Sequence, residues 1–288
     1  MPKIKYIDKS FYKKSLGLIS EVNQIISDYD AQGYFLTLRQ IYYQLVTRNI
    51  IKNEDKSYDN LGNLVRDARL TGNIDWFAVE DRTRNLRGFN YWENPAAFLE
   101  DKVKEYRIDP WSDQHYYIEV WVEKDALIDI VSQAATRHDV NHFSCRGFTS
   151  ISEMWRAAQR FNHEHKSGKE CVVIYLGDHD PSGLEMSADI QNRFNTFGAK
   201  VTLKRIALTM SQIEKYNPPP NPTKSKDTRA PAYIEKYGYT SWELDALEPR
   251  VLDELITDSI LKYLDVEVFS EAKVRQDQQR KELLKLVV

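Results

Sequence analysis

The stretch Tyr175-Leu-Gly-Asp-His-Asp-Pro-Ser-Gly183 decides the fold, because it joins a short apolar run to a segment with helical character. That run covers residues 171–177, and a similar run over residues 116–122 ends directly before Glu123 and Lys124. Short, nearly continuous apolar runs are typical of strands that are buried on both faces of a parallel sheet. We therefore expect acidic side chains to gather at the carboxyl ends of neighbouring strands, where open α/β sheets bind their ligands.

The spacing of the acids within this stretch favours a metal site. Asp178 and Asp180 lie two residues apart, so on an extended chain both point to one side while His179 points away. With Glu123 they offer hard oxygen ligands, and Mg²⁺ needs few protein carboxylates because water and substrate phosphate complete its shell. The pattern predicts phosphate chemistry with Mg²⁺, or with Mn²⁺ as an alternative. Asp180 before Pro181 also fits the N-cap of the next helix, a role that can coexist with metal binding.

From residue 116 onward the chain alternates between strand patterns and helix patterns. This order predicts an α/β domain with a mainly parallel sheet. The expected strands cover residues 116–122, 141–145, 171–177 and 200–208, and the expected helices cover residues 125–138, 150–166 and 182–195. The flanking segments are a connecting helix over residues 96–107, a proline-rich loop over residues 216–232, and closing helices over residues 242–264 and 271–286.

The N-terminal part carries a different pattern, in which three helices precede a short strand. Three helices followed by a strand with a basic tip are the order of a winged-helix domain, whose third helix and wing contact DNA. We therefore expect a winged-helix domain over residues 1–94 and an α/β domain over residues 95–288. Thr37 is placed to cap the second helix. The expected helices cover residues 11–30, 38–48 and 58–70, and the expected strand covers residues 74–79.

Composition and charge are those of an ordinary globular protein. The 288 residues include 42% hydrophobic and 29% charged side chains, with no membrane-length apolar run and no signal-peptide core, so we expect a cytoplasmic protein. Cys145 and Cys171 fall in or beside predicted strands and are expected in the core.

A formal net charge of −3 gives no overall signature of nucleic-acid binding. A local group of arginines forms either a solvated helix face or a phosphate-binding patch. Its members are Arg66, Arg69, Arg82, Arg84 and Arg87.

Two motifs together resemble a family of DNA-cleaving proteins. Glu123-Lys-Asp-Ala126, a glycine turn at Gly147 and the signature Asp178-His-Asp-Pro-Ser-Gly183 resemble the Toprim domain of the topoisomerase VI A subunit and of the meiotic double-strand-break protein. Upstream, Leu38-Arg-Gln-Ile-Tyr-Tyr43 is similar to the Arg-Asp-x-Tyr/Phe-Tyr motif on the winged-helix domain of the same proteins. The resemblance covers about residues 10–210. It is closest to the compact, free-standing, Mini-A-like members.

The resemblance implies a type IIB topoisomerase A-like enzyme that performs a Mg²⁺-dependent transesterification on double-stranded DNA. Tyr43 would attack a backbone phosphate and stay linked to the 5′ end, Arg39 one helical turn earlier would assist it, and Glu123 would act in acid–base chemistry. The metal ligands would be Glu123, Asp178 and Asp180, and the DNA-binding residues would be Arg66, Arg69, Arg82, Arg84 and Lys124.

The resemblance also implies an assembly. The active unit would be a homodimer in which the tyrosine of one subunit meets the metals of the other, which suits a cut on each of two antiparallel strands. The sequence contains no phosphate-binding P-loop, so strand passage driven by ATP would require an ATPase partner that this chain does not itself imply.

Some residues leave alternatives open. Gln40 stands where the tyrosine motif of the family has aspartate, so the local support of Tyr43 is an open point. The rivals are a Toprim nuclease that hydrolyses DNA with water and uses Tyr43 structurally, and a winged-helix DNA-binding protein without catalysis. Glu243 and Asp245 either add acids to the site or, in the interpretation favoured here, cap and charge the start of the last helical segment.

Overall fold

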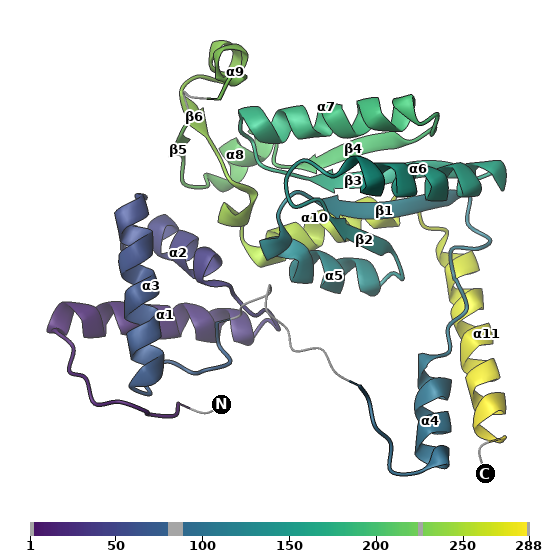
Figure 1. Ribbon diagram of the computed structural model, residues 1–288, viewed down its shortest axis with the longest axis horizontal. Coiled ribbons are helices and arrows are strands. Elements are labelled where there is room, and N and C mark those ends of the chain that lie inside the picture. The colour runs from purple at the N-terminus through teal and green to yellow at the C-terminus, as the bar shows by residue number, and fades with distance from the viewer. Residues whose placement is uncertain (1–2, 80–88, 224–226, 287–288) are drawn as a thin grey trace.

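The structure, a computed structural model, describes residues 3–79, 89–223 and 227–286. It consists of an N-terminal helical region and a four-stranded parallel sheet with helices between its strands, which confirms the expected mixed α/β fold. None of the described helices is both long and apolar enough to cross a membrane. Figure 1 shows the helical region on one side, the sheet on the other, and a pair of helices that extends away from the sheet.

All four strands of the sheet run parallel, so their carboxyl ends lie at one edge. The strand order is β2-β1-β3-β4, which places β1 and β3 side by side in the centre. Val122 and Leu176, the last residues of these two strands, are paired, so Glu123 and Asp178 start from neighbouring positions. Each strand agrees with its predicted range to within two residues. The strands are β1 (Tyr116–Val122), β2 (Asn141–Ser144), β3 (Glu170–Leu176) and β4 (Thr202–Ala207).

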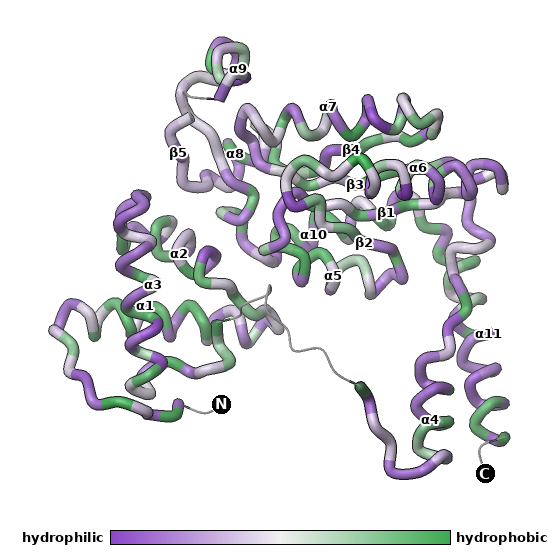
Figure 2. The backbone as a smooth tube through the Cα atoms, in the orientation of Figure 1, coloured by the Kyte–Doolittle hydropathy of each residue, from purple (hydrophilic) through white to green (hydrophobic). Residues whose placement is uncertain are grey.

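Helices cover both faces of the sheet, because alternate residues of each strand point to opposite faces. On one face Val120 of β1 packs in a core with α5 and α10. On the other face Trp121 packs with Phe161 of α6 and Phe194 of α7. Figure 2 shows hydrophobic and hydrophilic stretches alternating along α7, as expected of a helix that buries one face. The bounds are η1 (Asp125–Leu127), α5 (Ile128–Thr136), α6 (Ile151–Lys166), α7 (Pro181–Thr196) and α10 (Pro249–Leu261).

The N-terminal region contains the three predicted helices around a core of its own. Ile25, Leu45 and Leu61, one from each helix, are fully buried in that core. Thr37 caps the second helix as predicted, since its side chain accepts a hydrogen bond from the backbone N–H of Gln40. The helices are α1 (Lys13–Asp30), α2 (Leu38–Thr47) and α3 (Asp55–Leu70).

The strand expected over residues 74–79 is wrong. Asp75 instead forms a local turn, in which its carboxylate accepts a hydrogen bond from the backbone N–H of Phe77 at 2.7 Å. Such short-range bonds from aspartate compete with a strand ladder. Only Val79 makes a bridge, to Leu36 before α2. The basic tip expected beyond this segment, with Arg82, Arg84 and Arg87, lies outside the described residues.

The segment after β4 also differs from the expectation, and the difference matters for the site. The proline-rich loop contains a short strand and the first residues of a helix, and the helix expected from residue 242 begins only at Pro249. Residues 240–246 instead run back along the sheet edge, where His179 and Trp242 exchange two backbone hydrogen bonds of 2.9 and 3.0 Å. The elements are α8 (Met210–Tyr216), β5 (Asn221–Pro222), α9 (Ala230–Tyr237), β6 (Thr240–Ser241) and η2 (Leu244–Ala246).

The pair of helices that extends from the sheet consists of the connecting helix α4 (Pro95–Glu105) and the C-terminal helix α11 (Val266–Leu284). The hydroxyl of Tyr106 donates to Gln279 at 2.6 Å, and Arg280 donates to the carbonyl of Tyr106 at 2.9 Å. The helix α11 begins five residues before its predicted start at residue 271. The reason is Asp265, whose carboxylate caps the first turn of α11.

Candidate active site at the carboxyl edge of the sheet

The carboxyl ends of β1 and β3 bring Glu123 and Asp178 together, as the sequence predicts. The backbone N–H of Asp178 donates to Glu123 Oε2 at 2.8 Å, and both side chains are buried. One oxygen of Asp178 accepts a hydrogen bond from the N–H of Leu244, also at 2.8 Å. These bonds fix the two carboxylates at the edge of the sheet, facing the segment that follows β6.

Asp180 lies at the start of α7 and has the capping role that its sequence context allows. Its carboxylate accepts a hydrogen bond from the N–H of Gly183 at 2.6 Å. Gly183 packs directly on the site, because a Cβ at this residue would overlap the carbonyl oxygen of Asp178 and lie 3.0 Å from Glu123 Oε2. Gly177 is as tightly placed, with its hypothetical Cβ 2.8 Å from the same oxygen. Two glycines therefore leave the space that the Glu123 carboxylate occupies.

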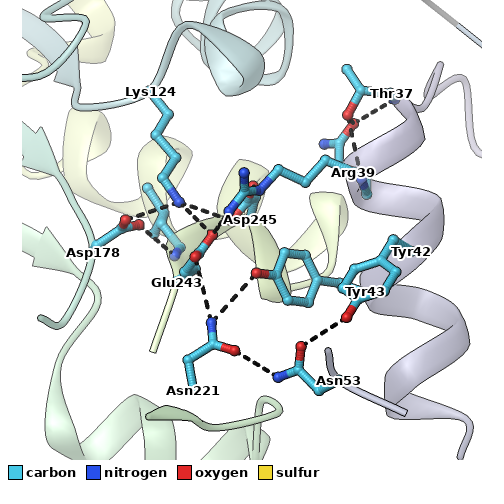
Figure 3. A network of polar contacts seen from close by, with 12 residues as sticks. Thr37, Arg39, Tyr42, Tyr43, Asn53, Lys124, Asp178, Asn221, Glu243 and Asp245 are labelled. Carbon is cyan, nitrogen blue, oxygen red and sulfur yellow. Dashed lines mark hydrogen bonds and ion pairs between the residues drawn. The ribbon is translucent and has the colours of Figure 1, made fainter. Parts of the chain in front are cut away.

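Glu243 and Asp245 join the site, and the interpretation of these two acids as helix caps is wrong. Both point at Lys124, whose Nζ lies 2.9 Å from Glu243 and 3.1 Å from Asp245. The same Nζ lies 2.9 Å from Asp178, so one ammonium group holds three carboxylates, as Figure 3 shows. We refer to the five acids of this edge as the acid cluster. Its members are Glu123, Asp178, Asp180, Glu243 and Asp245.

Arg39 connects helix α2 to the acid cluster. Its guanidinium forms an ion pair with Glu243, and its Nε lies 2.9 Å from an oxygen of Asp245. Within the described residues the Nε and that oxygen have no hydrogen-bond partner, so this second contact is a charge interaction without hydrogen-bond alignment. Arg39 also lies over the ring of Tyr43, with 5.8 Å between the guanidinium carbon and the ring centroid. The helical spacing of Arg39 and Tyr43 therefore places both beside the acids.

Tyr43 is buried, and its hydroxyl faces the polar contacts of the site (Figure 3). The side-chain amide of Asn221 donates to this hydroxyl at 3.5 Å and to Glu243 at 3.4 Å. Burial raises the pKa of Tyr43 well above its usual value, and the carboxylates of Asp245 and Glu243 raise it further. The phenol therefore needs activation before it can act as a nucleophile at neutral pH.

The pKa values of the acids in the cluster are shifted in different directions. Burial, followed by the charge of Asp178, raises the pKa of Glu123 to about 7. Burial also raises the pKa of Asp245, although Lys124 counteracts it. At Glu243 burial is outweighed, because Lys124 and Arg39 lower the pKa of that carboxyl to about 2. With a pKa of about 7, Glu123 can exchange a proton near neutral pH.

Gln40 has a structural role that explains a residue other than aspartate at this position. Its side-chain oxygen accepts a hydrogen bond from the N–H of Thr37 at 2.9 Å, while the hydroxyl of Thr37 accepts from the N–H of Gln40. This reciprocal pair is a capping box, which stabilises the first turn of α2. Arg39 and Tyr43 are thereby held on a helix with a well-defined start.

The donor set of the acid cluster fits a divalent cation such as Mg²⁺ by its chemistry. Carboxylate oxygens are hard ligands, and the charge of Asp178 adds to burial in raising the pKa of Glu123. Among the described residues, however, no group of three or more His, Cys, Asp or Glu side chains already has the geometry to hold an ion. Lys124 holds three of the five acids in the arrangement seen.

The basic residues expected to contact DNA differ in their surroundings. Arg66 is exposed on α3 and pairs with Asp67 at 3.0 Å. Arg69 is half-buried, donates to the carbonyl of Trp76 and lies 5.0 Å from its ring, so it holds the segment after α3. Lys124 is half-buried among the acids. Arg82 and Arg84 belong to the segment that the structure does not describe.

Replacing Gly183 by alanine is expected to lower the free energy of unfolding by about 2 kcal/mol, because the added Cβ overlaps the backbone of Asp178 and the loop must shift. The matched control is Gly17→Ala in α1, where nothing lies within 4 Å of the added Cβ. That change is expected to stabilise the protein by roughly 0.5–1 kcal/mol, as alanine does in exposed helix positions. Urea denaturation of both variants measures the difference, and equal effects would contradict the close packing at Gly183.

The fold and site define a mixed α/β protein that holds a tyrosine-bearing helix against an acid cluster at the carboxyl edge of a parallel sheet. Comparison of the chain with models of protein families, with curated proteins and with solved structures found no match. The two sequence motifs and the geometry of the acid cluster are therefore what supports a function for this chain.

Proposed function

We propose that this chain is a compact, type IIB topoisomerase A-like enzyme that cleaves double-stranded DNA in a Mg²⁺-dependent transesterification. The N-terminal helical region would be its winged-helix domain, and the sheet with its helices would be its Toprim domain. One observation carries the proposal. The hydroxyl of Tyr43 is connected to the acid cluster through Asn221 and Glu243, with contacts of 3.5 and 3.4 Å, so the two motifs contribute to one site.

In the proposed reaction the phenolic oxygen of Tyr43 attacks a backbone phosphorus atom and forms a phosphotyrosyl bond. The bond from phosphorus to the 3′ oxygen breaks, which leaves a free 3′ hydroxyl and a 5′ end bound to protein. Asp245, whose pKa is raised by burial, is the base that would take the proton of the phenol, and Arg39 would stabilise the phenolate and the phosphate. Glu123, with its pKa near 7, delivers the proton that the 3′ oxygen takes up.

Glu123, Asp178 and Asp180 would hold the cation of this reaction. When bound, Mg²⁺ would neutralise the phosphate and stabilise the charge on the leaving oxygen. Lys124 interacts with Asp178, and burial is outweighed at Lys124 because the surrounding carboxylates hold its pKa well above the usual value. This ammonium group therefore remains charged and would be available to bind a DNA phosphate.

Cleavage of supercoiled plasmid tests the proposed function. The protein is incubated with plasmid and Mg²⁺ or Mn²⁺, and the products are separated on denaturing gels with and without protease treatment. Linear or nicked DNA whose 5′ ends carry protein would support the transesterase. Cut DNA with free ends would support the rival nuclease, and binding of DNA without cleavage in either metal would support the non-catalytic rival.

The burial of Tyr43 has a consequence for the assembly. Its side chain is 3% exposed and faces the acid cluster of its own chain, so a DNA strand cannot reach the hydroxyl in this arrangement. We propose that DNA binding separates helix α2 from the acid cluster, and that the freed tyrosine meets the acids of a second copy. The contacts that must open are the polar ones of Arg39 with Glu243 and Asp245 and of Asn53 with Asn221, together with the packing of Ala246 in the core of the N-terminal helices.

Mixed dimers of two inactive variants are expected to recover cleavage. A subunit with Tyr43→Phe keeps its acids and a subunit with Asp178→Asn keeps its tyrosine, so a dimer of the two contains one complete shared site. Random assembly makes half of the dimers mixed, which predicts roughly a quarter of the wild-type adduct, mostly as nicks. Each variant alone is the control. No recovery in a dimer purified through two different tags would contradict a shared site.

A further inference from the structure

We propose that Arg205 is a positioning residue that fixes the acid-bearing loop of the site, residues 177–183. This inference rests on the proposed function, since it concerns the same acids. Arg205 comes from β4, the strand beside β3, and its guanidinium donates to the carbonyls of Gly177 at 2.8 Å, Gly183 at 3.0 Å and Asp178. One side chain therefore ties the beginning and the end of this loop together.

The same guanidinium also reaches the helix that follows the loop. It donates to the hydroxyl of Ser187 in α7 at 2.8 Å, and it lies 5.7 Å from the ring centroid of Tyr175 at the end of β3. The loop is thereby attached to β4 on one side and to α7 on the other. A planar guanidinium with five N–H donors suits several carbonyls at once, whereas a lysine ammonium would reach fewer of them in a defined geometry.

The position of the bonded carbonyls explains why they matter for the acids. Asp178 is the first acid of the loop, and Gly177 comes directly before it. Gly183 is the residue whose N–H donates to the carboxylate of Asp180. The loop continues the pairing with β4 only through Gly177, whose N–H donates to Ala207 and whose carbonyl accepts from Leu208. Beyond this point Arg205 supplies the bonds that a strand ladder would supply, so it sets the separation of Asp178 and Asp180.

Arg205 also places a positive charge close to the acids. Its charge interacts with those of Glu123, Asp178 and Asp180, the three residues that would hold the cation. Arg39, in contrast, pairs with Glu243 and Asp245, and Lys124 pairs with these two acids and with Asp178. Arg205 therefore offsets the repulsion of the three carboxylates while its guanidinium binds the backbone carbonyls of the loop.

The test is the affinity of the folded protein for Mn²⁺, measured by calorimetric titration without DNA. Arg205→Lys keeps the charge and loses the fork of donors, and it is expected to weaken Mn²⁺ binding by about 10- to 100-fold, as losses of groups that orient metal ligands do. The control is Lys204→Met at the neighbouring exposed position of β4, which is expected to bind Mn²⁺ as the wild type does. Thermal unfolding of each variant, recorded alongside, reports any change that is only structural.

A second variant serves if Arg205→Lys does not fold. Ser187→Ala removes one partner of the guanidinium and leaves the three carbonyl bonds, so Mn²⁺ binding is expected to weaken about threefold. Wild-type affinity in Arg205→Lys, or in Ser187→Ala where only that variant folds, would overturn the role of Arg205, whatever happens to the melting temperature. A wild-type protein that neither binds Mn²⁺ nor cleaves plasmid would instead overturn the proposed function, which keeps the two failures distinct.

Discussion

Replacing Tyr43 by phenylalanine is expected to abolish the covalent protein–DNA adduct and to lower cleavage by at least ~1,000-fold, because the reacting oxygen is removed. The fold should tolerate the change. Among the described residues the hydroxyl of Tyr43 accepts one long hydrogen bond, of 3.5 Å from Asn221, so its loss should alter the free energy of unfolding by less than about 1 kcal/mol. Denaturing gels of the cleavage products measure the adduct, and chemical denaturation measures the stability.

The adjacent Tyr42 offers a matched control with the opposite profile. Its hydroxyl accepts a hydrogen bond from the N–H of Glu54 at 2.8 Å and contacts Asn53 at 3.0 Å, away from the acid cluster. Tyr42→Phe leaves the N–H of Glu54 without this partner, so it is expected to cost about 1–2 kcal/mol of stability while the adduct still forms. Cleavage that survives in Tyr43→Phe and yields free 5′ ends would show that Tyr43 is structural and that the nuclease alternative is right.

The second large effect is expected for Asp178→Asn. Asparagine keeps the shape of the side chain and still accepts the hydrogen bond from the N–H of Leu244, so the loop should stay folded. The change removes a negative charge from the proposed cation site, and stabilisation of the phosphate by the cation is worth several kcal/mol. Cleavage is therefore expected to fall by a factor on the order of 100 to 1,000. Mn²⁺ binding, measured by titration, should weaken with it.

The control for this change is Asp189→Asn in α7. Asp189 pairs with Arg193 at 2.9 Å on the surface of the same helix that Asp180 caps, and it does not belong to the acid cluster. The same loss of one charge should there leave cleavage and Mn²⁺ binding unchanged. Equal cleavage by the wild type and Asp178→Asn would remove the acid cluster from the proposed reaction.

The parts of the fold that depend on local pattern were predictable. The run over residues 116–122 is β1 to the residue, because a strand buried on both faces has a continuous apolar sequence. The proximity of Glu123 and Asp178 followed from topology alone, since adjacent parallel strands end at the same edge. The cap at Thr37 was visible because side-chain capping involves residues only three positions apart.

The acids that the sequence interpretation misplaced depend on long-range contacts. Glu243 and Asp245 approach Lys124, some 120 residues earlier in the chain, because the backbone of Trp242 pairs with His179. No helical or strand period spans such a separation. A signal was nevertheless present, since two acids separated by one residue repeat the spacing of Asp178 and Asp180, and a short extended segment points such side chains to one side.

The strand that was predicted after α3, and that the structure does not contain over residues 74–79, has a local cause of the opposite kind. The apolar residues 74, 76, 77, 78 and 79 favour a strand by composition, but the carboxylate of Asp75 binds the backbone two residues on and turns the chain. The pairing of Arg39 with the acid cluster, in contrast, depends on how the helical region meets the sheet. That meeting also involves Ala246, which packs in the core of the N-terminal helices.

Mass spectrometry of the protein bound to cleaved DNA tests the central claim most directly. After cleavage with Mg²⁺, nuclease treatment and trypsin digestion, the peptide covering residues 40–48 contains both Tyr42 and Tyr43, and fragment ions distinguish them. The account predicts a nucleotide joined through its 5′ phosphate to Tyr43. A nucleotide on another residue, or cleaved DNA with free 5′ phosphates and an unmodified peptide, would contradict it.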